Sequence, residues 1–342
     1  MNLSADGIRK ILCIKLKGIG DVVLAGIVFD SLTEAFPKAE IHYLTEKPSE
    51  ALLAKLPFVS KVHLFRKKEN FGGPKTILDV RRERFDLVLD FYSNPRTALI
   101  TYLSGAKYRA GFPYRGRTYA YNILGPRERA TYHAADLHLK FIEMAGIRIT
   151  SKKLYFGMDS NDAEFADTFW KQTFTGNDLV TGISPTGGWE SKKCDADKLY
   201  EIAATVQKNF NSKILILWGP GDEADAEQIH KMSDRKFILA PKCSITEMGA
   251  LIKKCTGMIA NDSGPMHIAT AVGTPVLGLY GPTDPRLQGP YGKNNRYFRL
   301  EELECIGCNL LVCPRKHECF RELPAGVIAE LYSDMINGAV RG

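Results

Sequence analysis

The sequence has no apolar run that could cross a membrane. Its longest apolar stretches, such as residues 87–89 and 213–218, have the length of a strand and are flanked by charged residues or glycine. A spanning helix needs about 20 apolar residues. Residues 1–10 are polar and lead straight into a strand pattern, without the apolar core of a secretory signal. These absences predict a cytoplasmic protein.

A disulfide framework and an excess of acidic residues are also lacking. Eight cysteines are too few to staple a chain of 342 residues. Four of them lie singly in segments expected to pack, as reduced and buried thiols do: Cys13, Cys194, Cys243 and Cys255. The formal net charge of +7 favours an anionic partner. Charge alone does not choose among a nucleotide, a phospholipid surface and a nucleic acid.

Short β-rich runs alternate with amphipathic helical stretches along the chain. The strands expected in the first half are 11–16, 40–44, 62–65 and 87–91, and the helices are 21–36, 49–56, 76–85, 97–103 and 134–145. Those in the second half are strands 180–184, 214–218, 237–239, 258–260 and 276–280, and helices 196–210, 225–232, 245–254 and one after 263. This rhythm predicts an α/β protein with doubly wound parallel sheets.

The length of the chain favours two domains. We expect them at residues 1–160 and 161–324, joined by a connector near 150–175. Residues 325–342 are expected to form a C-terminal helix that packs back toward the N-terminal domain.

The first strand-to-helix turn, residues 17–21, reads Lys-Gly-Ile-Gly-Asp. It lacks the third glycine of a dinucleotide-binding fingerprint, which disfavours an NAD-dependent dehydrogenase. Asp21 has two interpretations that the residues leave open. It is either a helix cap or first-turn acid, stabilised there by the helix dipole, or a general base at the mouth of a cleft between the domains.

A second turn, residues 261–267, reads Asn-Asp-Ser-Gly-Pro-Met-His and opens an apolar helix that ends near Gly273. Glycine and serine at a helix start leave backbone N–H groups pointing outward, and the helix dipole adds positive potential. This favours a diphosphate site without a Walker lysine. The alternative is an ordinary capping motif with Asp262 or Ser263 as the cap. His267 alone is more typical of a packed histidine than of a catalyst.

With these turns the sequence resembles the lipopolysaccharide heptosyltransferases and their relatives, glycosyltransferase family 9. The matching motifs occur in order over most of the chain, at residues 17–21, 189–193, 219–223, 261–267 and 273–285. The resemblance implies the GT-B fold, two Rossmann-like doubly wound domains that face each other across a cleft. It also implies sugar transfer from a nucleotide diphosphate, with ADP-heptose as the leading donor. The acceptor would be a lipopolysaccharide core or related envelope glycolipid, met by peripheral contact at the inner face of the inner membrane.

The resemblance also implies a mechanism and a set of site residues. The reaction would be an inverting displacement that needs no metal or other cofactor. Asp21 would be the base, and Lys192 would supply positive charge to the leaving diphosphate. The donor-binding residues would be Ser184, Lys192, Glu223, Cys243, Ser244, Asp262, Ser263, Gly264 and His267. The acceptor-binding residues would be Gly18, Gly20, Arg115 and Arg117. Cys243 departs from the family pattern, in which a larger apolar residue is familiar, so the identity of the nucleotide stays open.

The segment 107–129 carries six basic residues and one acid, Glu128, interleaved with four tyrosines. In the family this side of the N-terminal half faces the acceptor, so the resemblance implies contact with an anionic glycolipid. Arginine among tyrosines also suits single-stranded nucleic acid. No nucleic-acid-binding motif accompanies the segment, and we expect no nucleic-acid partner. A plain solvated loop is the remaining alternative.

Residues 195–197 read Asp-Ala-Asp, the short acidic string with which metal-dependent GT-A transferases hold a divalent ion. Here the string precedes an amphipathic helix, so N-capping is the better account and no catalytic metal is expected.

Four cysteines lie close together near the C-terminus, at Cys305, Cys308, Cys313 and Cys319, with His317 beside the last. Thiolates so close in sequence suit a structural zinc ion or an iron–sulfur cluster. The spacing matches neither a zinc ribbon nor a ferredoxin run. Reduced or facultatively disulfide-bonded thiols are therefore the alternative, and no catalytic role is expected because glycosyl transfer needs no thiol nucleophile.

Three other functions are compatible with these residues. A family 9 transferase could use another nucleotide sugar. A nucleotide-sugar 2-epimerase, which shares the GT-B architecture, would release free sugar without an acceptor. A non-catalytic protein could bind an anionic lipid or RNA through the segment 107–129.

Overall fold

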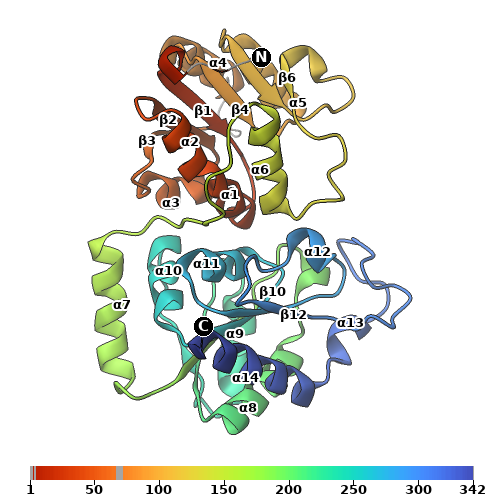
Figure 1. The fold of residues 1–342 in the computed structure, drawn as a ribbon. Helices are drawn as coiled ribbons and strands as arrows, with labels where there is room; N and C mark the ends of the chain where they lie inside the picture. Colours follow the sequence, from red (N-terminus) through yellow and green to blue (C-terminus); the bar gives the residue numbers. More distant parts are fainter. Residues whose placement is uncertain (1–2, 4, 67–71, 342) are drawn as a thin grey trace. The chain divides into compact units, whose positions relative to one another are not determined.

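The computed structural model describes residue 3 and residues 5–66 and 72–341. The chain divides into two compact units, Met1–Gly157 and Met158–Gly342, here called the N-terminal and the C-terminal unit (Figure 1). Among the described residues, no helix is both long enough and apolar enough to cross a membrane.

A parallel sheet with the strand order β3-β2-β1-β4-β5-β6 forms the centre of the N-terminal unit. Its strands are β1 (Lys10–Ile14), β2 (Glu40–Thr45), β3 (Val59–Leu64), β4 (Leu87–Asp90), β5 (Tyr108–Gly111) and β6 (Ile123–Leu124). Its helices are α1 (Ile19–Ala25), α2 (Phe29–Ala35), α3 (Glu50–Ala54), α4 (Gly72–Glu83), α5 (Pro95–Leu103) and α6 (Ala134–Met144). The strand order reverses between β1 and β4, so the carboxyl ends of these two strands form the topological switch point where such sheets bind ligands.

The C-terminal unit repeats this architecture with the order β12-β11-β10-β7-β8-β9. Its strands are β7 (Val180–Ser184), β8 (Lys213–Ile216), β9 (Ile238–Leu239), β10 (Gly257–Asn261), β11 (Val276–Leu279) and β12 (Arg296–Phe298). Its helices are α7 (Ser160–Thr173), α8 (Ala196–Phe210), α9 (Glu223–Met232), α10 (Ile245–Lys254), α11 (Gly264–Val272), α12 (Pro285–Gln288), α13 (Glu318–Arg321) and α14 (Ala325–Arg341). The switch point lies between β7 and β10, where Ser184 is opposite Ala260.

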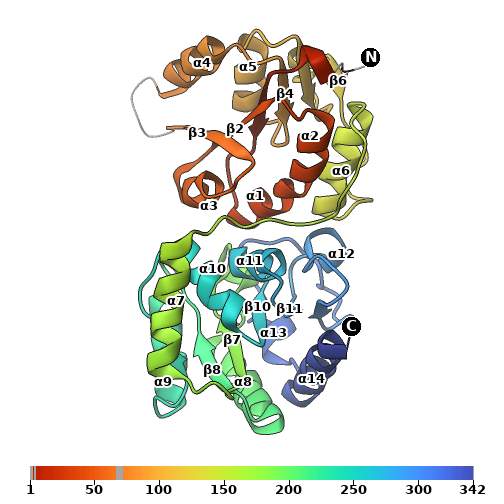
Figure 2. The same cartoon turned by 60° about the vertical axis from the view of Figure 1, so that its left-hand side comes forward.

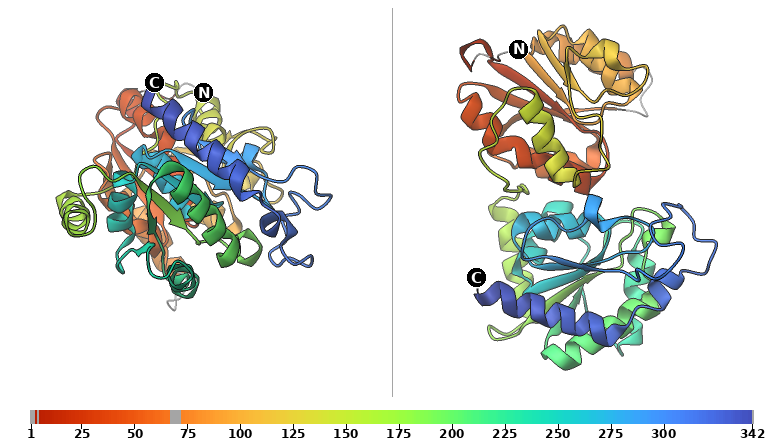
Figure 3. Two further views of the ribbon diagram at one scale, coloured as in Figure 1. Left: turned by 90° about the horizontal axis from the view of Figure 1, so that it is seen from below. Right: turned by 45° about the vertical axis from the view of Figure 1, so that its right-hand side comes forward.

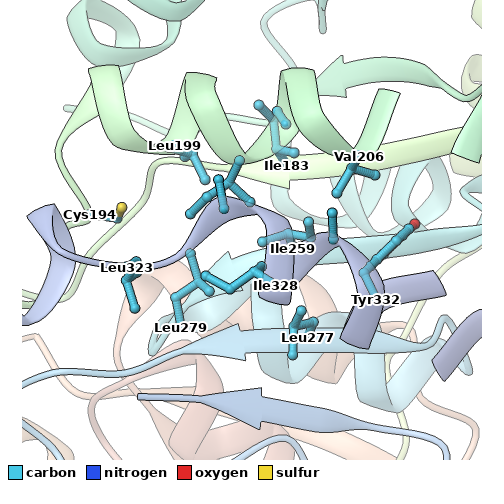
Figure 4. Close-up of a cluster of buried hydrophobic side chains, with 14 of the residues drawn as sticks. Ile183, Cys194, Leu199, Val206, Ile259, Leu277, Leu279, Leu323, Ile328 and Tyr332 are labelled. Carbon is cyan, nitrogen blue, oxygen red and sulfur yellow. The ribbon is translucent and has the colours of Figure 1, made fainter. Parts of the chain in front are cut away.

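Buried aliphatic side chains from the sheet and from helices α8, α9 and α14 form the core of the C-terminal unit (Figure 4). Ile183, Ile259 and Leu277 come from β7, β10 and β11. The C-terminal helix α14 lies beside α8 of its own unit (Figure 3). Tyr332 of α14 donates a hydrogen bond of 2.9 Å to Thr181 of β7.

Several elements differ from the sequence prediction. The helix predicted over 21–36 is divided into α1 and α2 by a 3-10 turn, Gly26–Val28. The expected connector contains α7, which packs beside α10 (Figure 2). This helix escaped prediction because its exposed face is polar and its start depends on a reciprocal capping box between Asp159 and Asp162. The basic segment 107–129 is not a plain loop, because it contributes β5 and β6 to the first sheet.

Candidate active site

The switch point of the C-terminal unit is organised by Asn261, the last residue of β10. Its side chain is completely buried. The amide oxygen accepts a hydrogen bond from Cys194 N (3.3 Å), and the amide nitrogen donates to the carbonyl oxygens of Pro185 and Thr186 (both 3.3 Å). Asn261 thereby fixes the chain that follows β7, which ends at the equally buried Ser184, against the end of β10.

A buried ion pair lies directly after Asn261. The ammonium nitrogen of Lys192 is 2.5 Å from Oδ2 of Asp262, and the two side chains are 6% and 5% exposed. Thr283 donates a hydrogen bond of 2.7 Å to the same carboxylate oxygen. The ammonium also lies 4.0 Å from the ring centroid of Trp189. Asp262 therefore joins the loop after β7 to the loop after β11, and each charge has the partner that burial requires.

The predicted anion-binding helix start is present as α11. Ser263 occupies its N-cap position, but its hydroxyl donates to the carbonyl of Asn261 (3.2 Å) and does not cap the helix. The helix begins at Gly264, carries the buried His267 in its second turn, and ends at Gly273 in the left-handed conformation. Because no side chain caps the first turn, the arrangement suits the anion-binding interpretation better than the capping one.

Three other predicted donor residues lie on the far side of β7 from Asp262. Glu223 is exposed and begins α9, which follows β8. Ser244 caps α10, since its hydroxyl accepts from Glu247 N (3.2 Å) and its own N–H donates to the Glu247 carboxylate (2.6 Å). Burial raises the pKa of the preceding Cys243 thiol to about 11, which keeps that thiol neutral. All three follow the carboxyl ends of strands, at the edge where the sheet binds ligands.

In the N-terminal unit, Asp21 lies in the first turn of α1, whose N-cap is Gly18 with φ of 80°. A Cβ atom at Gly18 would collide with the Asp21 carboxylate, so the glycine makes room for it. Gly20 is buried within the helix. The Lys15 ammonium lies 3.3 Å from Oδ1 of Asp21 and 5.6 Å from the ring centroid of Tyr92. Lys15 follows β1 and Tyr92 follows β4, so the group marks the switch point of this unit.

Asp90 at the end of β4 is a second buried acid at the same switch point. Its carboxylate accepts hydrogen bonds from the backbone N–H groups of Ser93 (2.7 Å) and Tyr92 (3.1 Å) and from the Tyr121 hydroxyl (2.8 Å). Burial nevertheless raises its pKa to about 6. Sequence reasoning missed Asp90 and Lys15. The available signal was a charged residue at the carboxyl end of each of two adjacent apolar strands.

The two predicted acceptor arginines have different surroundings. Arg117 donates to the Ser93 carbonyl (3.0 Å) and its guanidinium lies 5.1 Å from the ring centroid of Tyr114. Arg115 is exposed. Arg109 lies in β5 and donates to two backbone carbonyl groups of its own unit. Part of the basic segment is therefore structural, and Arg115 is the predicted residue most open to a ligand.

Asp195 occupies the N-cap position of α8, as predicted, but its side chain caps nothing. Its carboxylate pairs instead with the guanidinium of Arg321 (3.2 Å) and with Nδ1 of His317 (3.5 Å). Because the Arg321 guanidinium and the His317 ring already occupy this carboxylate, it is a poor candidate for holding a divalent ion.

The four clustered cysteines are free thiols, as are the other four. Burial raises the pKa of Cys319, and the three neighbouring thiols raise it further, to about 12. Among the described residues, one group brings three ligand atoms within 4.8 Å of one another, and it contains none of these cysteines. Zinc–sulfur bonds of about 2.3 Å would need sulfur atoms roughly 4 Å apart. The structure thus shows separate thiols without a preformed tetrahedral site.

That one group is His42, His63 and Glu83 in the N-terminal unit. Nδ1 of His42 lies 3.0 Å from Nε2 of His63, and burial lowers the pKa of His63 to about 4. Glu83 already accepts from Lys61 (2.5 Å) and Lys10 (3.0 Å), and these partners lower its pKa to about 2. Two ammonium groups would repel a cation at this position. The group is best described as a buried histidine pair beside a paired carboxylate.

Two Rossmann-like units, each with buried charged residues at its switch point, form the architecture of a GT-B glycosyltransferase. Residues 75–317 match the family described as glycosyltransferase family 9 (heptosyltransferase). The chain belongs to this family. The predictions of family, fold and enzyme class are thereby confirmed.

The relatives described next match this chain over most of its length. The chain is 28% identical to the lipopolysaccharide core heptosyltransferase OpsX of Haemophilus influenzae, over 88% of this chain and 87% of that protein. Its fold is similar to that of the glycosyl transferase family 9 from Veillonella parvula DSM 2008, with a TM-score of 0.85 at 20% identity and coverage of 96% and 97%. The E. coli heptosyltransferase WaaC, solved with ADP-2-deoxy-2-fluoro heptose, gives a TM-score of 0.72 at 17% identity and coverage of 95% and 99%.

A more distant structure, the iron-containing dodecameric glycosyltransferase TibC from enterotoxigenic E. coli H10407, gives a TM-score of 0.57 at 14% identity. The match spans 98% of this chain and 76% of the TibC chain. At this identity the likeness concerns the fold alone.

Proposed function

We propose that this glycosyltransferase moves heptose from ADP-heptose onto a lipopolysaccharide core or a related anionic envelope glycolipid, with inversion at the anomeric carbon. The names of OpsX and of the WaaC complex support the sugar, nucleotide and acceptor. The observation that carries the proposal is the buried Lys192–Asp262 pair beside the uncapped start of α11. It offers a fixed cation and backbone donors to a diphosphate at a topological switch point.

The donor would meet the C-terminal unit along the carboxyl edge of its sheet. The diphosphate would bind Lys192 and the first-turn N–H groups of α11, near Ser184, Ser263, Gly264 and His267. A diphosphate competes with Asp262 for the ammonium group. Once displaced, the Asp262 carboxylate keeps its hydrogen bond from Thr283 and can accept from a hydroxyl group of the sugar. Glu223, Cys243 and Ser244 would lie toward the nucleoside, since they follow β8 and β9.

In the reaction, the acceptor hydroxyl oxygen would attack the anomeric carbon while the bond from that carbon to the phosphate oxygen breaks. The bonding electrons leave with the nucleoside diphosphate, and the proton passes to Asp21. Lys192 and the α11 amides would stabilise the negative charge that develops on the leaving group. Because these groups supply the positive charge, we propose a step without a catalytic metal ion.

The acceptor would meet the N-terminal unit. Gly18 and Gly20 shape the turn that presents Asp21, and Arg115 and Arg117 would attract phosphate or carboxylate groups. An acceptor anchored in lipid would bring the protein to the inner face of the inner membrane as a peripheral protein.

The test is a thermal-shift screen against ADP-, GDP- and UDP-sugars, followed by product analysis with core glycolipid. A ligand at about 100 times its dissociation constant stabilises by about 2.7 kcal/mol. We expect the largest shift with ADP-heptose and a product in which heptose is bound to the acceptor. Free epimerised sugar formed without acceptor would replace the proposal by an epimerase. Binding of anionic lipid or RNA without any nucleotide sugar would replace it by a non-catalytic function.

The segment 305–319, here called the Cys-rich segment, carries a separate proposal, a structural zinc ion or iron–sulfur cluster. Its four thiols are suitable ligands, and the Cys313 sulfur already accepts two backbone N–H hydrogen bonds that hold it in place. The sulfur atoms must draw closer to bind one ion, so reduced thiols are the competing state. Elemental analysis of anaerobically purified protein separates the two. Stoichiometric zinc or iron supports the metal, whereas four reactive thiols with neither element eliminate it.

A further inference from the structure

The Cys-rich segment packs against two of the three loops that carry the Lys192–Asp262–Thr283 group, the loop after β7 and the loop after β11. On one side it joins the loop after β11. Gly307 N donates to the carbonyl oxygen of Gly281 (3.0 Å), and Asn309 N donates to that of Pro282 (2.8 Å). These two carbonyl groups directly precede Thr283, whose hydroxyl holds Asp262. The segment therefore supports the partner of the Asp262 carboxylate.

On the other side the Cys-rich segment holds the short turn that contains Lys192. This turn, Glu190–Lys192, is a single 3-10 turn that lies in the loop between β7 and α8. Ser191 N donates to the Leu311 carbonyl oxygen (3.2 Å), and the Ser191 hydroxyl donates to that of Leu310. The side chains of Leu310 and Leu311 are exposed. The backbone of the segment, and not its apolar side chains, is thus what holds the residue next to Lys192.

Glu190 and His317 form a second connection to the same turn. One oxygen of the Glu190 carboxylate accepts from Cys313 N (3.1 Å), and the other lies 2.7 Å from Nε2 of His317. The imidazole ring is not aligned to donate along this line, so the contact is a close approach of the ring to the carboxylate and not a hydrogen bond. The other ring nitrogen faces Asp195 at 3.5 Å. His317 is therefore held between a carboxylate of the Lys192 turn and a carboxylate at the start of α8.

The position of His317 depends on a tight turn built around the Cys313 sulfur. Lys316 and His317 both adopt the left-handed conformation, with φ of 52° and 58°. The Cys313 sulfur accepts from Arg315 N (3.4 Å) and from His317 N (3.3 Å). Two strained residues in a row persist only where surrounding contacts hold them. This turn places the His317 ring against Glu190.

The Asp262 carboxylate cannot by itself keep Lys192 in place for the donor. A diphosphate that binds the ammonium group takes over the electrostatic role of Asp262, so the turn then needs an anchor that the donor does not displace. The contacts from the Cys-rich segment are of this kind, because they use the Ser191 backbone and the Glu190 side chain and leave Lys192 itself to the ligand.

We propose that Glu190 and His317 are positioning residues, which hold the Lys192 turn so that its ammonium group meets the diphosphate of the donor. This inference rests on the proposed role of Lys192. Glu190 is 52% exposed, so solvent screens its charge and the expected effect is modest. Replacing either residue should weaken nucleoside diphosphate binding by about threefold to tenfold, which corresponds to up to about 1.4 kcal/mol.

The test is a double-mutant cycle with ADP, measured by titration calorimetry on the full chain. Glu190→Gln and His317→Ala are each made in the parent and in Lys192→Ala. Glu304→Gln, at an exposed carboxylate directly before the Cys-rich segment, is the matched control. If the two residues act through Lys192, their replacement weakens ADP binding in the parent and has no further effect in Lys192→Ala. Equal losses in both backgrounds overturn the inference. Unchanged ADP binding by Lys192→Ala contradicts the proposed function instead.

Chemical rescue gives a second measurement, which does not require ADP affinities of the weakly binding Lys192→Ala double mutants. His317, Glu190 and Asp195 line a cavity of about 480 Å³, which leaves space for a small ligand to enter. Free imidazole should restore ADP affinity to His317→Gly and leave the affinity of Glu190→Gln unchanged. A His317→Gly protein with the parental unfolding temperature and parental ADP affinity would refute the positioning role.

Discussion

The ammonium group of Lys15 lies 3.3 Å from the carboxylate of Asp21, and the two side chains differ sharply in exposure, at 6% and 48%. The buried cation follows β1, while the carboxylate begins α1 and opens to solvent. The Lys15 ammonium group contacts one carboxylate oxygen of Asp21, and about half of the Asp21 side chain stays exposed and accessible to an acceptor. This geometry suits a base whose orientation is fixed by its neighbour, as proximity effects require.

Asp21→Asn tests the base directly. The substitution keeps the shape of the side chain and removes its capacity to accept the acceptor proton. Turnover should fall by roughly 10²–10⁴-fold while donor affinity stays nearly unchanged. Steady-state kinetics and calorimetry measure the two quantities, with Glu34→Gln, an exposed acid on α2, as the control. Near-normal turnover would remove Asp21 from the mechanism.

Lys15→Met tests the partner of the base. Methionine fills much of the buried space of the lysine stem but leaves Asp21 without its cation. We expect turnover to fall by about tenfold, the scale of a charge-assisted contact, with donor affinity unchanged. In the Asp21→Asn background the same substitution should change turnover little, because residues that act as a unit are not additive. Additive losses would show that Lys15 acts elsewhere.

The fold could be predicted from the sequence because each strand and the helix that follows it are encoded by local patterns, an apolar run and a periodic amphipathic stretch. The residues that follow the carboxyl ends of β7 and β10 were predicted as a site for the same reason. Lys15 and Asp90 were missed, because the order of strands in a sheet is set by long-range packing that no local pattern records. The Glu190–His317 pair was missed for the same reason, because its two residues lie far apart in the sequence. In the same network, 126 residues separate Asp195 from Arg321.

Lys192→Ala should weaken binding of a nucleoside diphosphate by about 1.5–3 kcal/mol, because a charge-assisted contact to the phosphates is lost. The adjacent Lys193 provides a matched control. Its ammonium group pairs with Asp222 (2.6 Å) and Asp225 (2.9 Å), so Lys193→Ala should leave the affinity close to that of the parent. Calorimetry that finds equal affinities for Lys192→Ala and parent would refute the assignment.

Charge reversal at Arg115 tests the acceptor side. Arg115 is exposed, whereas Arg117 is tied to the Ser93 carbonyl, so Arg115→Glu is the variant less apt to disturb folding. The acceptor KM should rise and donor affinity should not change. The effect should shrink with added salt, since exposed charges are screened over about 10 Å at 0.1 M. Lys38→Glu, an exposed reversal on the same unit, controls for net charge. Parental kinetics at low salt would leave Arg115 without a role.

Asp90 gives the N-terminal unit a specific dependence of stability on pH. Burial raises the pKa of this carboxyl to about 6 from an ordinary value of 3.8. The folded state therefore binds the proton more tightly than the unfolded state. The stabilisation is fully present below about pH 4 and is lost as the pH rises through about 6. A shift of about two units corresponds to roughly 3 kcal/mol.

Asp90→Asn removes this titration while keeping an oxygen for the N–H groups of Ser93 and Tyr92. The unfolding free energy of the variant, relative to the parent, should therefore increase by up to about 3 kcal/mol between pH 4 and pH 7. Urea unfolding at several pH values measures it. All three tryptophans, Trp170, Trp189 and Trp218, belong to the C-terminal unit. If the units unfold separately, the change should appear in the circular dichroism transition of the N-terminal unit and not in tryptophan fluorescence. A stability difference independent of pH would mean that Asp90 stays ionised in the folded protein.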